Sequence, residues 1–521
     1  MENKKKYITE EQSRKLSCLS LIYVSVILGI LPLVYHDYYF DILITKYSFY
    51  YIVTIAFIVI MTLVGIFIGY INKLKLKDVN LKKVFTLPEW ALIGFLLIAI
   101  VSTIQSDFKW ESFWGNEGRY TGCFLLLLYG ISTLIVAKTL KLKKWILDIF
   151  LLAGMLVCLL GITDYFQMDL LGFKADMYPE QYNMFMGTIG NVNSYTSYVA
   201  LVMGTATVLF AIERNIWKAV IYYFCMAITF FAIVMGLSDN SYLALGALFA
   251  FLPLFLFNSK TGIKRYFVIV ATFACVIYGI DIINKVMPDH VLIMEGILQK
   301  LSGFSKLEYV VVSLVIICFA IYIAAHFSIG KNDYLGHKWQ FIWLGLIVLG
   351  AIALIYVLID VNIVGNLTRY GSIGEYLYFN DEWGTHRGYN WRIAIENYLK
   401  FPLIHKLFGF GPDTYGIVTY YGDFNDMVSK YQEIYDSAHN EYLQYFITMG
   451  PFSLMCYFSL LISGGLQMIR KAKDNPCVIA VLFAIICYAI QAFVNISVPV
   501  VAPVMFALFA VGLAGSRENK P

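Results

Sequence analysis

One histidine stands where a long polar stretch meets an apolar run. His439 lies in the sequence Asp-Ser-Ala-His-Asn-Glu-Tyr-Leu-Gln at 436–444. Asp436 or Ser437 is a natural N-cap, so the sequence predicts that His439 lies in the first turn of the next helix. A helix dipole disfavours the imidazolium there, and a neutral His439 can accept a proton near pH 7. A histidine at a membrane interface that only binds water or lipid headgroups would show the same pattern.

Arginines in the polar segments have the chemistry to hold an anionic group. A guanidinium is always charged and bonds two oxygens through a planar fork. It would stabilise an anionic group, or a group on which negative charge develops during a reaction. The alternative role is pairing with lipid headgroups or with carboxylates of the same loop. The candidates are Arg119, Arg369, Arg387 and Arg392.

The sequence indicates no metal site. It contains no His-x-x-x-His, no His-Glu-x-x-His and, in the outer segments, no Asp-x-Asp. The nine cysteines all lie in or beside apolar runs and their number is odd, which favours buried thiols over disulfides or metal ligands. We therefore expect neither a metal nor another cofactor.

These polar residues are set in a strongly apolar chain of 521 residues. Hydrophobic residues make up 60% and charged residues 14%, with a mean hydropathy of +0.69. The charged share of a soluble protein is normally about a quarter. The composition therefore excludes a soluble enzyme, a disordered scaffold and a small disulfide-stapled domain. The net charge of only +4 argues against a nucleic-acid partner.

The apolar runs predict an all-α, polytopic membrane protein with about fourteen transmembrane helices. A span needs about 20 predominantly apolar residues. Lys4 to Lys6 precede the first run and no small-residue cleavage site follows it, so we expect an uncleaved first span. The predicted spans are 16–35, 49–71, 88–105, 121–138, 145–163, 191–212, 218–237, 240–258, 266–283, 308–327, 339–360, 438–469, 477–494 and 498–514.

The lysines and arginines predict that both termini are cytoplasmic. With the N-terminus inside, inner segments hold 26 of the 39 Lys and Arg residues, as the positive-inside rule requires. The inner loops are short, so any chemistry belongs to the outer face. The predicted order is a cytoplasmic tail at 1–15, eleven spans within 16–360, a large extracytoplasmic loop at 361–437, three spans within 438–514 and a cytoplasmic tail at 515–521.

The large loop carries two local features. Residues 391–400 have apolar residues at the spacing of a short amphipathic helix that lies on the bundle or the lipid interface. The Gly-Phe-Gly-Pro sequence at 409–412 allows a tight turn with close backbone approach, although an ordinary loop corner would look the same.

Three blocks, in a fixed order, resemble the O-antigen ligase/polymerase superfamily of bacterial membrane glycosyltransferases. The large outer loop between the eleventh and twelfth spans fits the same family, and the resemblance extends over about 90–500. The blocks are Gly-Thr-Ile-Gly-Asn-Val-Asn-Ser-Tyr at 187–195, Arg392 leading through Pro402-Leu403 to Leu-Phe-Gly-Phe-Gly-Pro at 407–412, and Ala-His-Asn-Glu-Tyr-Leu-Gln at 438–444 followed by Gly450.

The resemblance implies a metal-independent, inverting glycosyltransferase of the bacterial plasma membrane. Such an enzyme takes a saccharide from undecaprenyl diphosphate on the outer leaflet and joins it to a hydroxyl of an acceptor sugar. His439 matches the family's essential histidine, the candidate base or positioning group for that hydroxyl. Arg392 matches the loop arginine that clamps the donor diphosphate. The implied partners are the lipid-linked donor, the saccharide acceptor, the bilayer, and a flippase and chain-length regulator.

One element of the family is missing. The family often carries a Ser-Arg pair at the start of a middle span, and the corresponding stretch 236–244 has no arginine. Arg119 is the first candidate to replace it, because its surroundings at 114–122 resemble an Arg-x-x-Gly element of many relatives. Arg387 and then Arg369 follow, so the expected diphosphate-binding set is Arg392, Arg119 and Arg387.

Two other functions stay open from the sequence. A transporter or flippase of lipid-linked saccharide would place ionisable residues in mid-membrane and show paired repeats, and this chain has few such charges and no visible repeat. A structural partner in a polysaccharide-synthesis complex is the third hypothesis. Among enzymes we favour a polymerase of capsule, exopolysaccharide or wall glycan over a ligase, because the Lys-, Ile-, Phe- and Tyr-rich composition suggests a Gram-positive source without lipopolysaccharide.

Overall fold

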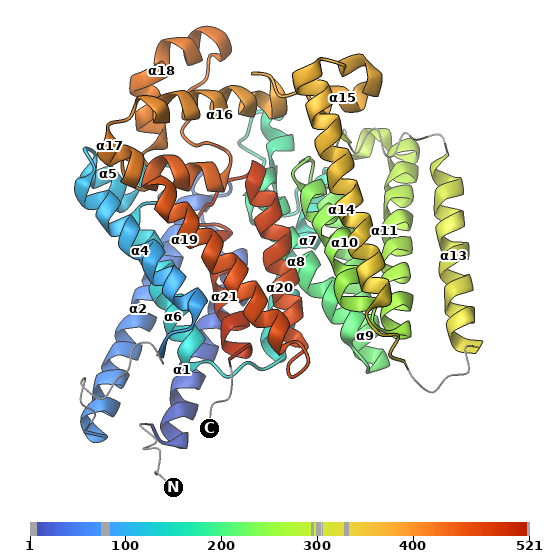
Figure 1. Cartoon of the computed structure of the whole chain (residues 1–521), viewed down its shortest axis with the longest axis horizontal. Coiled ribbons are helices and arrows are strands. Elements are labelled where there is room, and N and C mark those ends of the chain that lie inside the picture. The colour runs from blue at the N-terminus through green and yellow to red at the C-terminus, as the bar shows by residue number, and fades with distance from the viewer. Residues whose placement is uncertain are drawn as a thin grey trace.

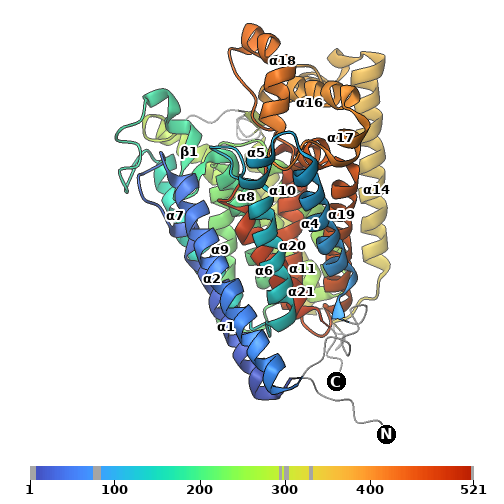
Figure 2. The ribbon, with the colours of Figure 1, turned by 90° about the vertical axis from the view of Figure 1, so that its left-hand side faces the viewer.

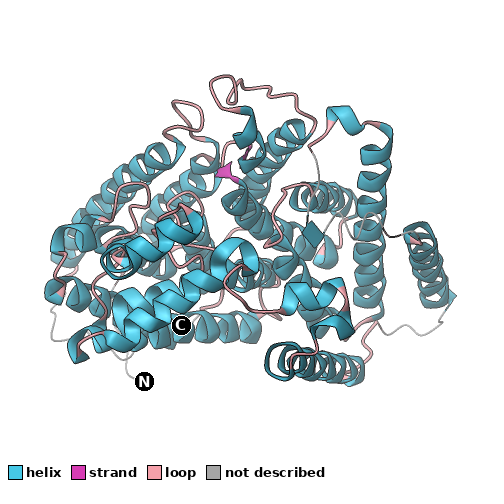
Figure 3. Cartoon of the chain, turned by 90° about the horizontal axis from the view of Figure 1, so that it is seen from above, coloured by secondary structure: helices cyan, strands magenta, loops and turns pink. Residues whose placement is uncertain are grey.

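The computed structural model describes residues 8–73, 84–292, 296–297, 304, 306–327 and 333–517. Over these residues the protein is almost entirely helical. Its sheet is a two-stranded hairpin in which β1 (Phe185–Met186) pairs with β2 (Gly190–Asn191), the small magenta element of Figure 3. The basic residues 4–6 and most of the predicted inner connection at 72–87 lie outside the described residues.

Fourteen apolar helices among the described residues follow the order of the predicted spans. Eleven are long and apolar enough to cross a membrane, and three are shorter. The all-α polytopic class is therefore confirmed, and the count of fourteen spans stays a prediction. The long helices are α1 (Glu10–Gly29), α2 (Ile42–Ile71), α4 (Leu87–Gln105), α7 (Trp145–Tyr165), α8 (Val192–Ile212), α9 (Ile216–Val234), α11 (Lys260–Val286), α13 (Leu307–Phe327), α14 (Lys338–Ile359), α19 (Glu441–Lys471) and α20 (Cys477–Gln491); the shorter ones are α6 (Cys123–Thr139), α10 (Ser241–Leu256) and α21 (Ala502–Gly515).

Helix α8 forms the centre of the bundle. In its most apolar stretch 94% of the residues are buried, against none in α14. Gly204 brings α8 close to α20, because a Cβ at this position would lie 2.7 Å from the carbonyl oxygen of Phe483. Small residues allow such close approach between membrane helices. Helix α13 stands at the edge of the bundle in Figure 1 and helix α14 at the edge in Figure 2, where their apolar side chains suit contact with lipid.

The polar segments gather at one end of the bundle. The helices α5 (Lys109–Trp114), α15 (Ser372–Leu377), α16 (Trp383–Lys400), α17 (Leu403–Phe408) and α18 (Tyr415–Tyr431) lie at the upper end in Figures 1 and 2. The first residues of α1 and the last residues of α21 lie at the opposite end. The loop between α14 and α19 is thus a small helical cap, with more helix than the single segment predicted at 391–400.

Candidate active site

His439 lies just before α19, not in its first turn. The N-cap is Asn440, whose side-chain oxygen accepts hydrogen bonds from the N–H groups of Tyr442 and Leu443. The prediction that Asp436 or Ser437 caps this helix is therefore wrong, because the helix begins one residue after Asn440. His439 itself has a φ of 46°, a left-handed conformation that is strained for a residue with a side chain and that often marks functional sites.

Burial and neighbouring cations keep His439 neutral. Removal from water, with the positive charges of Arg387 and Arg119, lowers the pKa of His439 from 6.5 to about 4. The carboxylate of Asp436 acts in the opposite direction. The neutral imidazole expected from the sequence is thus present at pH 7, although burial and arginine charges cause it rather than the predicted position in the first turn.

Arg119 reaches His439 from a segment more than 300 residues earlier. Its Nε and one terminal nitrogen each donate to a carboxylate oxygen of Asp436 at 2.8 Å. The segment is held by Asp413, which is buried and accepts from the N–H groups of Asn116 at 2.7 Å and Thr121 at 3.0 Å. Burial raises the pKa of Asp413 to about 6, and those hydrogen bonds and the charge of Arg119 limit the rise.

Arg387 is the second cation beside His439. It follows three residues with positive φ, Gly384 to His386, which form a left-handed turn at the start of α16. The turn offers its own acceptors to the guanidinium, the carbonyl oxygen of Gly384 at 2.6 Å and the hydroxyl of Thr385 at 3.3 Å. Burial lowers the pKa of Arg387, and the charge of Asp239 opposes this.

The Nε of Arg387 is buried and has no hydrogen-bond partner among the described residues. A buried guanidinium nitrogen without an acceptor is costly. An anionic ligand would supply the missing acceptor.

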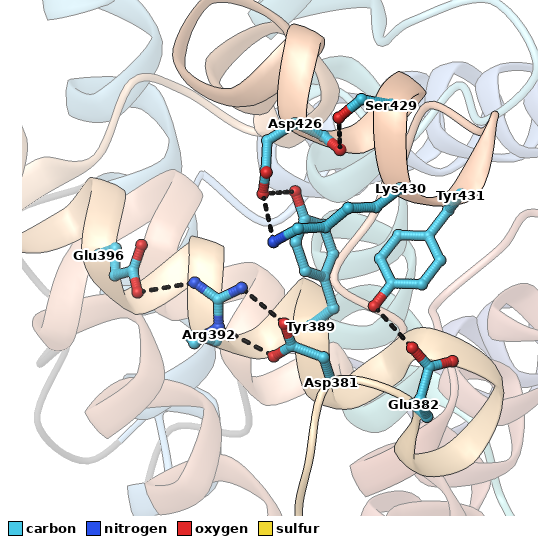
Figure 4. Close-up of polar contacts among 9 residues, drawn as sticks. All are labelled: Asp381, Glu382, Tyr389, Arg392, Glu396, Asp426, Ser429, Lys430 and Tyr431. Carbon is cyan, nitrogen blue, oxygen red and sulfur yellow. Dashed lines mark hydrogen bonds and ion pairs between the residues drawn. The ribbon is translucent and has the colours of Figure 1, made fainter.

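Arg392, in contrast, is fully engaged with carboxylates (Figure 4). Its Nε and one terminal nitrogen donate to Asp381 at 2.9 and 2.8 Å, and its other terminal nitrogen donates to Glu396 at 2.9 Å. These partners raise the pKa of Arg392. The cations that lower the pKa of His439 are Arg387 and Arg119. The structure therefore brings Arg119 and Arg387 to the histidine and gives Arg392 a place in an ion-pair network.

The face of α16 next to Arg392 holds the histidine segment. Asn390 donates from its side-chain amide to the carbonyl oxygen of Ser437 at 2.7 Å, and the indole N–H of Trp391 donates to that of Ala438 at 2.8 Å. Helix α16 thus fixes the two residues that precede His439. Arg369 lies elsewhere, 3.4 Å from Asp360 at the end of α14, with 61% of its side chain exposed.

Polar side chains from the start of α8, the α9–α10 connection and the segment after α20 form one hydrogen-bonded cluster. The side-chain oxygen of Asn193 accepts from Ser238 at 2.7 Å and from Asn240 at 3.0 Å, and its backbone oxygen accepts from Asn495 at 2.9 Å. The cluster includes the Asn-x-Asn block at 191–193 and the 236–244 stretch that lacks the expected arginine. Asp239 stands in that stretch, and its charge acts on Arg387.

The Gly-Phe-Gly-Pro turn is a close backbone contact rather than an ordinary corner. At Gly409, with a φ of +68°, a Cβ would lie 2.0 Å from the carbonyl oxygen of Thr448 in α19. The N–H of Gly411 donates to the same oxygen at 2.8 Å. Gly450, also at positive φ, gives α19 a kink against the carbonyl of Leu407. These contacts fix the upper end of α19 and so the position of His439.

Glu441 closes the floor beneath the histidine. It is buried at the start of α19 and accepts from the hydroxyls of Tyr457 at 2.6 Å and Tyr488 at 2.9 Å. An adjoining cavity of about 20 Å³ is lined by Arg119 and Glu441, among others, and has room for about one water molecule. Glu441 therefore links α19 to α20, and Asp436 is the carboxylate that pairs with Arg119.

The sequence could not reveal several of these residues. Asp413 and Asp239 act on groups that are distant along the chain, and no local pattern marks them. Glu396 stands four residues after Arg392 on one helix, which is the spacing of a helical ion pair, so that interaction did have a signal. No group of three or more His, Cys, Asp or Glu suited to a metal ion occurs within the described ranges, and metal independence stays a prediction.

Comparison with known proteins supports one family. A family model described as O-antigen ligase matches residues 301–458, which include α13, α14, the helices α15 to α18 and the first part of α19. A search of curated proteins finds no match to the chain. The matched region contains His439, Arg387 and Arg392. Residues 301–458 thus resemble the O-antigen ligase family, and the chain as a whole is a multi-pass helical membrane protein.

Proposed function

We propose that this protein is an inverting polysaccharide polymerase that acts on undecaprenyl-diphosphate-linked oligosaccharide. The observation that carries the proposal is a neutral His439 beside two arginines, one of which has a buried nitrogen without an acceptor. A ligase that transfers the same donor to a different acceptor is the second candidate, favoured by the description of the matching family.

In the proposed reaction the acceptor hydroxyl gives its proton to the neutral imidazole of His439. The hydroxyl oxygen attacks the anomeric carbon from the face opposite the diphosphate, which inverts the configuration. The bond from the anomeric carbon to the phosphate oxygen breaks, and its electron pair leaves with undecaprenyl diphosphate. Arg119 and Arg387 stabilise the charge that develops on this leaving group.

Donor binding would also activate the base. The same two arginines lower the pKa of His439 in the free protein. A diphosphate bound between them would offset their charge and raise that pKa, so His439 would become a better base once the donor is in place.

We propose a positioning role for Arg392. To bind the diphosphate it would have to leave Asp381 and Glu396, which occupy all three of its nitrogens. In the proposed role it joins Asp381 to α16, the helix that carries Arg387 and holds the segment before His439.

We infer that the polar end of the bundle faces the outside of the plasma membrane. The first residues of α1 and the last residues of α21 lie at the other end (Figure 1), and the predicted inner loops are rich in lysine and arginine. Lipid-linked donor would then reach the site from the outer leaflet.

Reconstitution of the full-length protein in liposomes with undecaprenyl-diphosphate oligosaccharide tests the proposal. The wild type should produce a ladder of lipid-linked polymers, and His439→Ala should produce none although the variant remains folded in the membrane. His337→Ala is the matched control, because His337 is exposed beside the start of α14. A normal ladder from His439→Ala would refute the mechanism, and transfer only to a separate acceptor would identify a ligase.

A further inference from the structure

A second polar cavity lies at the same end of the bundle and shares no residue with the His439 site. Its volume is about 330 Å³, within the range of small-ligand pockets, about 300–1,000 Å³. It is formed by the segment after α7 and by Val291 and Leu292, near the β1–β2 hairpin seen in Figure 2. Its polar lining consists of Asp164, Gln167, Asp169, Lys174, Tyr182 and Asn183.

The cavity contains a buried ion pair that is too far apart to be hydrogen-bonded. Lys174 Nζ lies 3.8 Å from Asp164 Oδ1, and the two side chains are only 7% and 8% exposed. The other oxygen of Asp164 accepts from the N–H of Gly187 at 2.6 Å and the hydroxyl of Tyr39 at 3.5 Å. Within the described part of the chain the Lys174 ammonium donates no hydrogen bond to a protein acceptor, and Asp164 at 3.8 Å is its ion-pair partner. A buried ammonium normally has such acceptors.

The walls of the cavity are held in place before any ligand arrives. The Asp169 carboxylate accepts from the N–H groups of Phe173 at 2.9 Å and Lys174 at 3.0 Å. Gln167 donates to the carbonyl oxygen of Val291 at 2.8 Å. The ring of Phe173 packs against three tyrosines of the α1–α2 connection, including Tyr39. The lysine is therefore fixed in its position facing Asp164.

We propose that this cavity binds a saccharide unit of the polysaccharide chain. A hydroxyl both donates and accepts, so one or two sugar hydroxyls placed between Lys174 and Asp164 can satisfy both charges. An anion would be repelled by Asp164 and Asp169, and a cation by Lys174. The Tyr182 ring and the exposed amide of Asn183 stand at the rim, where they can contact the next sugar. The proposal rests on the proposed function, since it assigns the ligand to the same polymer.

Binding of free oligosaccharide tests this cavity separately from catalysis. The probe is the repeat oligosaccharide of the producing bacterium's surface polysaccharide, released from its carrier and so without diphosphate, titrated into full-length protein in nanodiscs. Lys174→Met should weaken binding about tenfold or more, the usual effect of losing a hydrogen bond to a charged group. Lys285→Met is the matched control, because the Lys285 side chain is 69% exposed. His439→Ala should bind as the wild type does.

A second variant, Asn183→Ala, and a second probe, inorganic phosphate, separate the possible outcomes of this test. Asn183→Ala alters only the exposed rim and should weaken binding by a smaller factor without affecting folding. In the polymerisation assay Lys174→Met should shorten the products while the rate of the first linkage stays within about twofold of wild type, as for a site that retains the chain. Unchanged binding in Lys174→Met and Asn183→Ala, or binding of inorganic phosphate that Lys174→Met abolishes, would overturn the saccharide site. A failure of the proposed function would appear instead as polymer made by His439→Ala.

Discussion

Replacing Arg387 with glutamine should move the acid limb of the pH–activity profile to higher pH. The pKa of His439 is about 4 because the side chain is removed from water and because Arg387 and Arg119 lie near it. Glutamine keeps hydrogen-bonding groups but carries no charge, so the pKa of His439 should rise in this variant. The rise should stay below 2.5 units, the difference between 6.5 and 4, since burial and Arg119 remain.

The size of the effect follows from the protonation of His439. With a pKa of about 4, about 90% of His439 is neutral at pH 5, and a rise of about one unit would reduce this share to about half. At pH 7 the histidine is neutral in both proteins. The loss of kcat/KM at pH 7 then reports only the missing contact to the diphosphate, about 10- to 100-fold for a hydrogen bond between charged groups.

The profile should be measured as kcat/KM between pH 3.5 and 8, because this quantity reports the free enzyme. Arg369→Gln is the control, since Arg369 pairs with Asp360 and should leave the limb unmoved. In the wild type the limb in kcat should lie at higher pH than the limb in kcat/KM, because bound diphosphate offsets the arginines. A wild-type limb near pH 6.5, or the same limb in Arg387→Gln as in wild type, would refute the reasoning.

Three further outcomes are expected. Gly409→Ala should destabilise the protein by about 3 kcal/mol or more, because the new Cβ would lie 2.0 Å from the carbonyl oxygen of Thr448. Thermal unfolding in detergent would measure this loss. Gly345→Ala is the control, because a Cβ at this position meets nothing within 4 Å. Arg392→Lys loses the fork to Asp381 and should reduce turnover at pH 7 without moving the acid limb; a selective rise in KM for the diphosphate donor would instead indicate direct contact. A metal chelator should leave turnover unchanged in vitro, and strong inhibition would contradict a metal-free reaction.

Sequence reasoning worked best where structure is local. Each predicted span coincides with an apolar helix, because length and hydropathy of one segment decide whether it becomes such a helix. Even the least distinct boundary, within 218–258, is correct: α9 ends at Val234 and α10 begins at Ser241. The amphipathic pattern at 391–400 lies within α16. The left-handed turn at 384–386 has no sequence pattern that distinguishes it from an ordinary start of a helix.

Sequence reasoning failed where partners come from distant segments. Asp436, Ser437 and Asn440 are all good N-caps, but the Asp436 carboxylate pairs with Arg119 and Asn440 is the residue that caps α19. The pairing of Arg119 with Asp436 spans 317 residues and could not be inferred from either segment alone. The diphosphate role expected for Arg392 stays a prediction, and its carboxylate partners Asp381 and Glu396 lie only 11 and 4 residues away.

The assembly of this centre from positions 119, 387 and 439 has a consequence for biogenesis. During synthesis Arg119 leaves the ribosome long before His439, whereas Arg387 leaves it shortly before the histidine. A partly translated chain therefore holds cations without a base. Under the proposed mechanism such a nascent chain could not act on carrier lipid, and catalytic competence would be acquired once His439 has joined the two arginines.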